Sequence, residues 1–269
     1  DVETKLGGWV EDVLSDLPSE EQEEAIAVDG KTLRGSRKPG APAAHFLSAV
    51  GHRLGLTLAQ VVVDEKTNEI PLMPHLLEQL VVKGRVFTMD ALLTQEKIAT
   101  GIVAEGGDYV MIVKENQPTL HEDLQTLFDE LLPEALQGSQ SETLDVGHGR
   151  IEERRLETSP LLNDYLQWPG RQQVFRLRRK TVFKKSGKQR GKTVYGITSC
   201  SPQKADAFKL LSFVRGHWGI ENRSHWVRDV TFDEDRSQVR KGSLPQVMAA
   251  LRNTVIGLMR LSGENSIAS

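Results

Sequence analysis

Short apolar runs of the β type, separated by helix-like segments, most constrain the fold of this 269-residue chain. Such runs occur at 25–33, 44–64, 84–92 and 108–116, and the second is long enough for a hairpin that turns at "HRLG". The helix-like segments 71–84 and 92–107 each end in glycine, a common helix stop. The order β-β-β-α-β-α-β predicts an α/β fold, a mixed sheet with helical crossovers.

The pattern changes at residue 139. Extended strands and turns are predicted over 139–202, with "SGKQRG" as a hairpin tip, and helical character returns over 203–269. We therefore expect 1–24 to be the end of a truncated N-terminal helical region that includes a helix over 8–17. We expect 25–138 to be the first part of a core, 139–202 a β-rich insertion and 203–269 the second part. The last helix should bury an apolar stripe made of Leu244, Val247, Met248, Leu251, Val255, Leu258 and Met259.

The charge of the chain is unevenly distributed. The formal net charge is −3, yet residues 176–192 carry nine Lys or Arg and no acid. This stretch is either a solvated hairpin or an arm that faces phosphates. Cys200 is the only cysteine, which excludes a disulfide framework and favours a reducing, cytoplasmic setting. No apolar run is long enough to span a membrane.

Three acids lie in surroundings that suggest chemistry. Asp29 and Asp90 each follow an apolar strand, where an ionised carboxylate needs a cation or hydrogen-bond donors. Asp29 could instead belong to an Asp-Gly turn, and Asp90 could cap the following helix. Glu221 lies in "RGHWGIENRSHW", where two glycines weaken the helix and suggest a close approach, although a helical ion-pair row would also explain the charges.

The same helix carries two histidines and two tryptophans. His217 and His225 are eight residues apart, about 12 Å along a helix, which is too far for both to bind one zinc ion. Three carboxylates from separate elements would instead make an oxygen site for Mg²⁺ or Mn²⁺. Trp218 and Trp226 are expected to pack into the core, with His217, Glu221 and Arg228 on the opposite face.

Five motifs, in order, resemble those of DDE transposases of bacterial insertion sequences, in particular the H-repeat-associated type. They are "IAVDGKTLRGS", "MDALLTQ", "YVMIVKENQ", "HGRIEER" and "HWGIENRSHWVRDVTFDED". The resemblance runs from about residue 24 to the C-terminus. It implies a ribonuclease-H-like mixed sheet flanked by helices, with a β-strand insertion between the second aspartate and the glutamate.

The resemblance also implies roles for individual residues. His217 and Arg228 stand where relatives carry a basic pair around the glutamate, commonly arginine and lysine, and Leu93 stands where many relatives have histidine. The implied catalytic residues, which would hold two Mg²⁺ or Mn²⁺ ions, are Asp29, Asp90 and Glu221.

The implied partner is double-stranded DNA, both transposon ends and target, bound by a homodimer. The expected reaction is metal-dependent cleavage of phosphodiesters at transposon ends followed by strand transfer. Two alternatives are a DNA-binding remnant without catalysis and a zinc hydrolase that uses His217 and His225. The residues expected to contact DNA are Lys114, Gln117, His148, Arg150, Arg154, His217 and Arg228.

Overall fold

The computed structural model describes residues 25–38, 40, 42–63 and 68–264, together with the isolated residues 5, 8, 12, 13 and 267. The helix predicted over 8–17 therefore lies outside the described residues, apart from isolated positions. The chain divides into two compact units. The first unit comprises residues 1–88, 105–107 and 215–269, and the second comprises 89–104 and 108–214.

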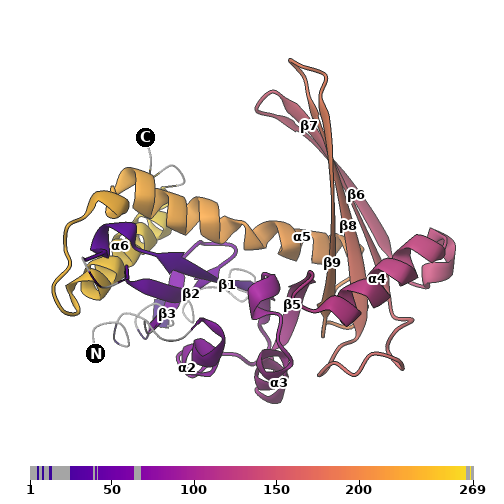
Figure 1. Ribbon diagram of the computed structural model, residues 1–269, viewed down its shortest axis with the longest axis horizontal. Coiled ribbons are helices and arrows are strands. Elements are labelled where there is room, and N and C mark those ends of the chain that lie inside the picture. The colour runs from indigo at the N-terminus through magenta and orange to yellow at the C-terminus, as the bar shows by residue number, and fades with distance from the viewer. Residues whose placement is uncertain are drawn as a thin grey trace. The chain divides into compact units, whose positions relative to one another are not determined.

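The first unit contains strands in the order β3-β2-β1-β4 (Figure 1). These are β1 (Ala25–Thr32), β2 (His45–Gly51), β3 (Thr57–Val63) and β4 (Val86–Met89). Strands β1, β2 and β3 pair antiparallel, which confirms the hairpin predicted at "HRLG". The short elements η2 (Arg34–Ser36), η3 (Ile70–Leu72) and α2 (Met73–Leu77) connect them, and α2 is shorter than the predicted helix.

Helical segments from the C-terminal part of the chain pack on these strands. They are the π-helical segments η6 (Ile220–His225) and η7 (Val227–Thr231), the 3₁₀ turn η8 (Glu234–Arg236) and α6 (Leu244–Leu261). Ile220 packs with Ala27 and Val50, and Ala249 packs with Leu33 and Phe46. The core of the first unit thus joins residues from opposite ends of the chain.

Helix α6 buries a different face from the one predicted. Four members of the predicted stripe are 42 to 50% exposed, namely Leu244, Leu251, Val255 and Leu258. The buried side consists of Pro245, Ala249, Ala250, Asn253, Ile256 and Gly257. Most of these residues are small, and a Cβ on Gly257 would lie 3.4 Å from Leu56 Cδ2, an ordinary van der Waals contact. The predicted apolar stripe is therefore wrong because close packing and polar pairing, not hydrophobicity alone, orient this helix.

The second unit contains strands in the order β5-β9-β8-β7-β6. They are β5 (Asp108–Val113), β6 (Gln140–Gly147), β7 (Arg150–Ser159), β8 (Gln173–Phe183) and β9 (Gln189–Thr198), all paired antiparallel. The predicted hairpin tip at "SGKQRG" is confirmed. Strand β9 hydrogen-bonds to β5, so the β-rich segment continues the sheet that β5 begins.

The helical elements of this unit are η4 (Ala91–Leu93), α3 (Glu96–Ala104), α4 (Pro118–Glu130) and η5 (Pro133–Leu136). Helix α5 (Ala207–His217) crosses the boundary between the units. A mixed α/β architecture is thus confirmed. Among the described residues, none of the helices is both long and apolar enough to cross a membrane.

Candidate active site

Asp29 lies in the middle of β1, not in a turn. It pairs with Ser48 of β2, and Gly30 pairs with Leu47. A Cβ on Gly30 would lie 1.9 Å from Glu69 Oε1, so a larger residue here would have to displace the Glu69 side chain. The Asp-Gly pair therefore reflects tight packing within a strand.

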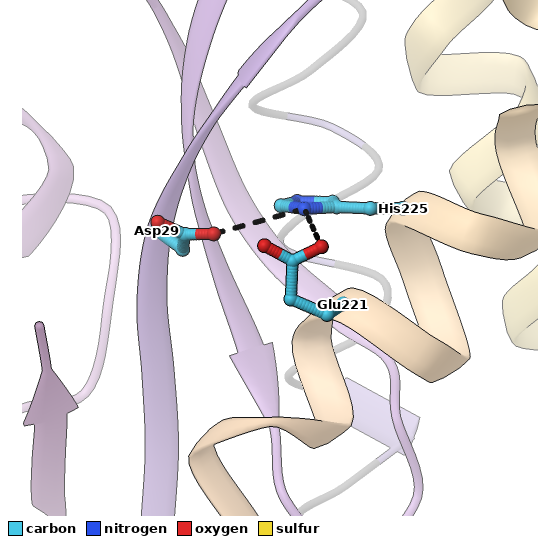
Figure 2. Close-up of side chains that lie close together, drawn as sticks. All are labelled: Asp29, Glu221 and His225. Carbon is cyan, nitrogen blue, oxygen red and sulfur yellow. Dashed lines mark ion pairs between the residues drawn. The ribbon is translucent and has the colours of Figure 1, made fainter. Parts of the chain in front are cut away.

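Glu221 and His225 meet Asp29 from segment η6 (Figure 2). His225 Nδ1 lies 3.7 Å from Asp29 Oδ2 and 3.8 Å from Glu221 Oε2. One ligand atom of each residue lies within 4.8 Å of the other two. Two carboxylates and an imidazole are all groups that coordinate divalent metals, so this donor set fits a cation.

The three side chains differ in exposure and protonation. The Glu221 side chain is 52% exposed, whereas that of His225 is 6% exposed. The adjacent His225 ring lowers the pKa of Glu221, which favours the carboxylate. Burial lowers the pKa of His225, which favours the neutral imidazole. Both shifts favour the protonation states that bind metals.

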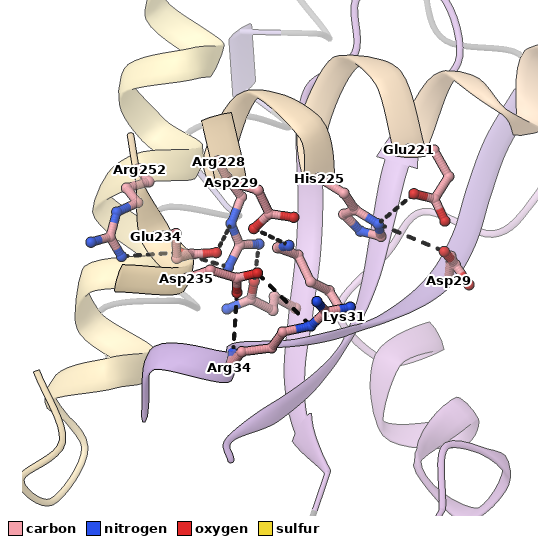
Figure 3. Close-up of polar contacts among 11 residues, drawn as sticks. Asp29, Lys31, Arg34, Glu221, His225, Arg228, Asp229, Glu234, Asp235 and Arg252 are labelled. Atoms are coloured by element: carbon pink, nitrogen blue, oxygen red, sulfur yellow. Dashed lines mark hydrogen bonds and ion pairs between the residues drawn. The ribbon is translucent and has the colours of Figure 1, made fainter. Parts of the chain in front are cut away.

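A second contact holds the helical segments against β1 (Figure 3). Lys31, two residues beyond Asp29 on the same strand face, donates to Asp229 Oδ1 at 2.6 Å. Lys31 is only 6% exposed. Alternate residues of β1 therefore meet residues four apart in the helical run, His225 and Asp229.

Arg228 is buried instead of facing solvent. Its guanidinium donates to both carboxylate oxygens of Glu234, at 2.9 and 3.1 Å, and Arg252 donates to the same carboxylate at 2.9 Å (Figure 3). The Arg228 and Glu234 side chains are 1% and 0% exposed. The expectation that Arg228 lies on an outward face, ready to contact DNA, is corrected: the guanidinium is used in an internal ion pair.

The tryptophans also lie opposite to their predicted side. Trp218 and Trp226 are 56% and 48% exposed, so the expectation that they pack into the core is wrong. Ile220, Ser224 and Val227 are buried in their place. Charged and polar groups can be buried on this face because they have partners on β1 and η8. Hydrophobic periodicity contains no information about such partners.

His217 does not join the acidic cluster. Its Nδ1 lies 3.1 Å from Thr88 Oγ1, which also contacts His52 Nε2 at 2.8 Å. Gly216 is needed beside this group, because a Cβ there would lie 2.2 Å from His52 Nδ1. A Cβ on Gly219 would meet nothing closer than 3.9 Å. Of the two glycines in the motif, only Gly216 is closely approached by another part of the chain, namely His52 of the β2–β3 hairpin.

Asp90 belongs to the second unit. It caps η4, accepting a hydrogen bond from the Leu92 N–H at 2.9 Å. Asn116 donates to the Ala91 carbonyl at 2.6 Å, and the Gln117 amide donates to the Thr94 carbonyl at 2.9 Å. The predicted DNA contact Gln117 therefore helps to hold the loop that follows Asp90, while Lys114 is exposed.

The "HGRIEER" motif forms the β6–β7 turn and the start of β7. His148, one of the predicted DNA contacts, lies in the turn with φ of 48°, before β7 begins at Arg150. Arg150 pairs with Glu152 at 3.2 Å, and Arg154 pairs with both Glu152 and Asp145. The motif thus contains a cross-strand charge network.

The comparisons with known proteins identify the family of this chain. Residues 20–258 match the transposase DDE domain, so the chain belongs to that family. It is 32% identical over 246 residues to "Putative transposase YncI" of Escherichia coli O157:H7, covering 88% of this chain and 62% of that protein. It is also 32% identical over 261 residues to "H repeat-associated putative transposase YhhI" of Escherichia coli K12, covering 91% and 66%.

The chain spans about two thirds or less of the length of these relatives. A solved structure, a piggyBac transposase synaptic complex with hairpin DNA, is similar at a TM-score of 0.46 and 13% identity, over 90% of this chain and 47% of that one.

Proposed function

We propose that this chain is the catalytic core of a transposase that cleaves phosphodiesters at transposon ends and joins the new 3'-hydroxyl to target DNA, on a ribonuclease-H-like core. The observation that carries the proposal is the meeting of Asp29 and Glu221, from opposite ends of the sequence, in one cluster of metal-binding groups. Membership of the DDE family supports the same reading.

In this proposal Asp29, Asp90 and Glu221 hold two divalent ions, Mg²⁺ or Mn²⁺. Divalent ions in such sites activate an attacking water or hydroxyl and stabilise the leaving oxygen. Strand β1 fixes Asp29. The Asp90 carboxylate accepts a hydrogen bond from the Leu92 N–H, which holds it at the end of β4. Glu221 is more exposed than Asp29, the other acid of the cluster, and is therefore accessible to a DNA strand.

The basic β8–β9 hairpin would supply salt-sensitive contacts to double-stranded DNA. Arg176 and Arg178 bind Glu157 and are less available for this purpose. The exposed cations nearer the tip are Lys180, Lys184, Lys185, Lys188, Arg190 and Lys192. Together with Lys114 and Arg150, they form the proposed DNA contacts, and the active complex is proposed to be a homodimer on DNA.

The decisive experiment measures cleavage and strand transfer on duplexes that carry the ends of the parent insertion sequence, with Mg²⁺ or Mn²⁺. Asp29→Asn, Asp90→Asn and Glu221→Gln should each abolish product, while Asp233→Asn, the same kind of change at an exposed acid that pairs with Arg236, should not. Full activity in any of the three variants contradicts the assignment of that residue. DNA binding without cleavage under either ion would instead favour a non-catalytic remnant.

A further inference from the structure

His225 is a buried histidine whose ring faces two carboxylates from different elements. Its side chain is 6% exposed, and Figure 2 shows its ring beside both carboxylates. Its distances to Asp29 and Glu221, 3.7 and 3.8 Å, are longer than ordinary hydrogen bonds. His225 Nδ1 therefore lies close to both carboxylates, at distances beyond those of ordinary hydrogen bonds.

The other ring nitrogen adds a second observation. His225 Nε2 is buried and has no hydrogen-bond partner in the described part of the chain. A buried histidine kept only for stability normally has its nitrogens hydrogen-bonded, since an unsatisfied polar atom is costly. Nε2 is not the nitrogen that faces the two carboxylates, so only Nδ1 is placed to share an ion with them.

The distances from His225 to the two carboxylates are compatible with one shared ion. Two ligand atoms that each lie about 2.1 Å from an ion are at most about 4.2 Å apart. The two Nδ1-to-oxygen distances, 3.7 and 3.8 Å, fall within this limit. Nearby Lys31 is paired with Asp229 at 2.6 Å, so its charge is already balanced.

We propose that His225 is a metal ligand through Nδ1, alongside Asp29 and Glu221, and that this nitrogen makes the site prefer Mn²⁺ and related transition ions to Mg²⁺. The inference rests on the proposed function in one respect, that Asp29 and Glu221 bind metal. Magnesium favours oxygen ligands and keeps much of its water, whereas first-row transition ions accept imidazole readily. A site of three oxygens would show no such preference from its protein ligands.

The test is metal binding by the full chain, independent of DNA cleavage. Calorimetric titration of metal-free protein should show tighter binding of Mn²⁺ than of Mg²⁺. Pulsed electron paramagnetic resonance of bound Mn²⁺ should show coupling to a directly bound ¹⁴N nucleus. Absence of this coupling in the unaltered protein overturns the proposal without any variant.

Variants then assign the nitrogen. His225→Gln should remove the ¹⁴N coupling and weaken Mn²⁺ binding by about tenfold or more, on the scale of losses at metal sites, with less effect on Mg²⁺. The matched control is His217→Gln, the same change on the same helical run at a ring that contacts Thr88, and it should retain the coupling. Asp29→Asn should weaken the binding of both Mn²⁺ and Mg²⁺.

The outcomes separate this inference from the proposed function. If cleavage depends on Asp29 and Glu221 but His225→Gln keeps the Mn²⁺ preference and the coupling, only the ligand role of His225 is wrong. If nitrogen coupling is present but no DNA cleavage occurs, the metal site stands and the transposase activity fails. Circular dichroism of each variant establishes that the fold is retained.

Discussion

Removing the charge of Glu234 should destabilise the first unit strongly. The Glu234→Gln substitution keeps the size of the side chain but leaves Arg228 without its anion. Arg228 is 1% exposed and makes two bonds to this carboxylate, and Arg252 makes a third. Gln60 Oε1, which also accepts a bond from Arg228 at 3.4 Å, is uncharged.

The size of the effect follows from the burial of both partners. Breaking a buried ion pair by removing one partner costs about 3–5 kcal/mol, because an uncompensated charge stays inside. For a chain of this size, 1 kcal/mol corresponds to about 2–4 °C in Tm, which gives a fall of about 6–20 °C. Urea denaturation followed by tryptophan fluorescence and calorimetric melting would measure the loss.

A neighbouring acid provides the control. Asp233 pairs with Arg236 at 3.6 Å, and the two side chains are 57% and 85% exposed. Its replacement by asparagine, which tolerates the positive φ of 48° found here, should cost less than about 1 kcal/mol. The triple variant Arg228→Met, Glu234→Leu and Arg252→Met should recover much of the loss, since it removes Glu234 together with both arginines that pair with it and so leaves no buried charge. A loss for Glu234→Gln as small as that for Asp233→Asn would refute the reasoning.

Three further predictions concern packing, pH and DNA. Gly216→Ala should lower Tm by several degrees because of its clash with His52, while Gly219→Ala should be neutral or stabilising; equal effects would contradict the packing argument. Burial, together with the neighbouring His217 and Arg223, lowers the pKa of His52 to about 3, so the folded state binds fewer protons than the unfolded one between about pH 6.5 and 3. Stability should therefore fall as the pH drops through this window, by at most about 1.4 kcal/mol per pH unit from this group, and denaturation of His52→Gln from pH 7 to 4 should show a shallower fall. Finally, Lys184→Gln with Lys185→Gln should reduce the salt dependence of DNA binding by about two units of log–log slope, measured by fluorescence anisotropy; an unchanged slope would place DNA elsewhere.

The strands and the candidate acids were predictable because they depend on local pattern. Short apolar runs of the β type identify β1 to β5, and the acids Asp29 and Asp90 follow apolar runs in which a charge is unusual. Glu221 stood out through its glycine-rich helix. The sequence also contained a signal that places His225 beside Glu221, because the two are four residues apart. From the sequence, His225 was considered only together with His217, as a candidate zinc pair.

The orientation of the helical segments depends on contacts between residues far apart in sequence. Arg228 is buried because Glu234 and Gln60 receive its guanidinium, and His225 is buried beside Asp29 of β1. The π-helical turns also alter the spacing of side chains from that of an ordinary α-helix. A pattern of hydrophobicity contains none of this information.

The sequence by itself determined the order of strands and helices, the family resemblance and the acids that deserve testing, since each depends on residue type and short-range spacing. Only the tertiary structure decided that Trp218 and Trp226 face outward, that Arg228 is an internal cation and that His225 lies with Asp29 and Glu221. The physical reason is that a buried polar group is stable only where specific partners meet it, and those partners come from distant parts of the chain.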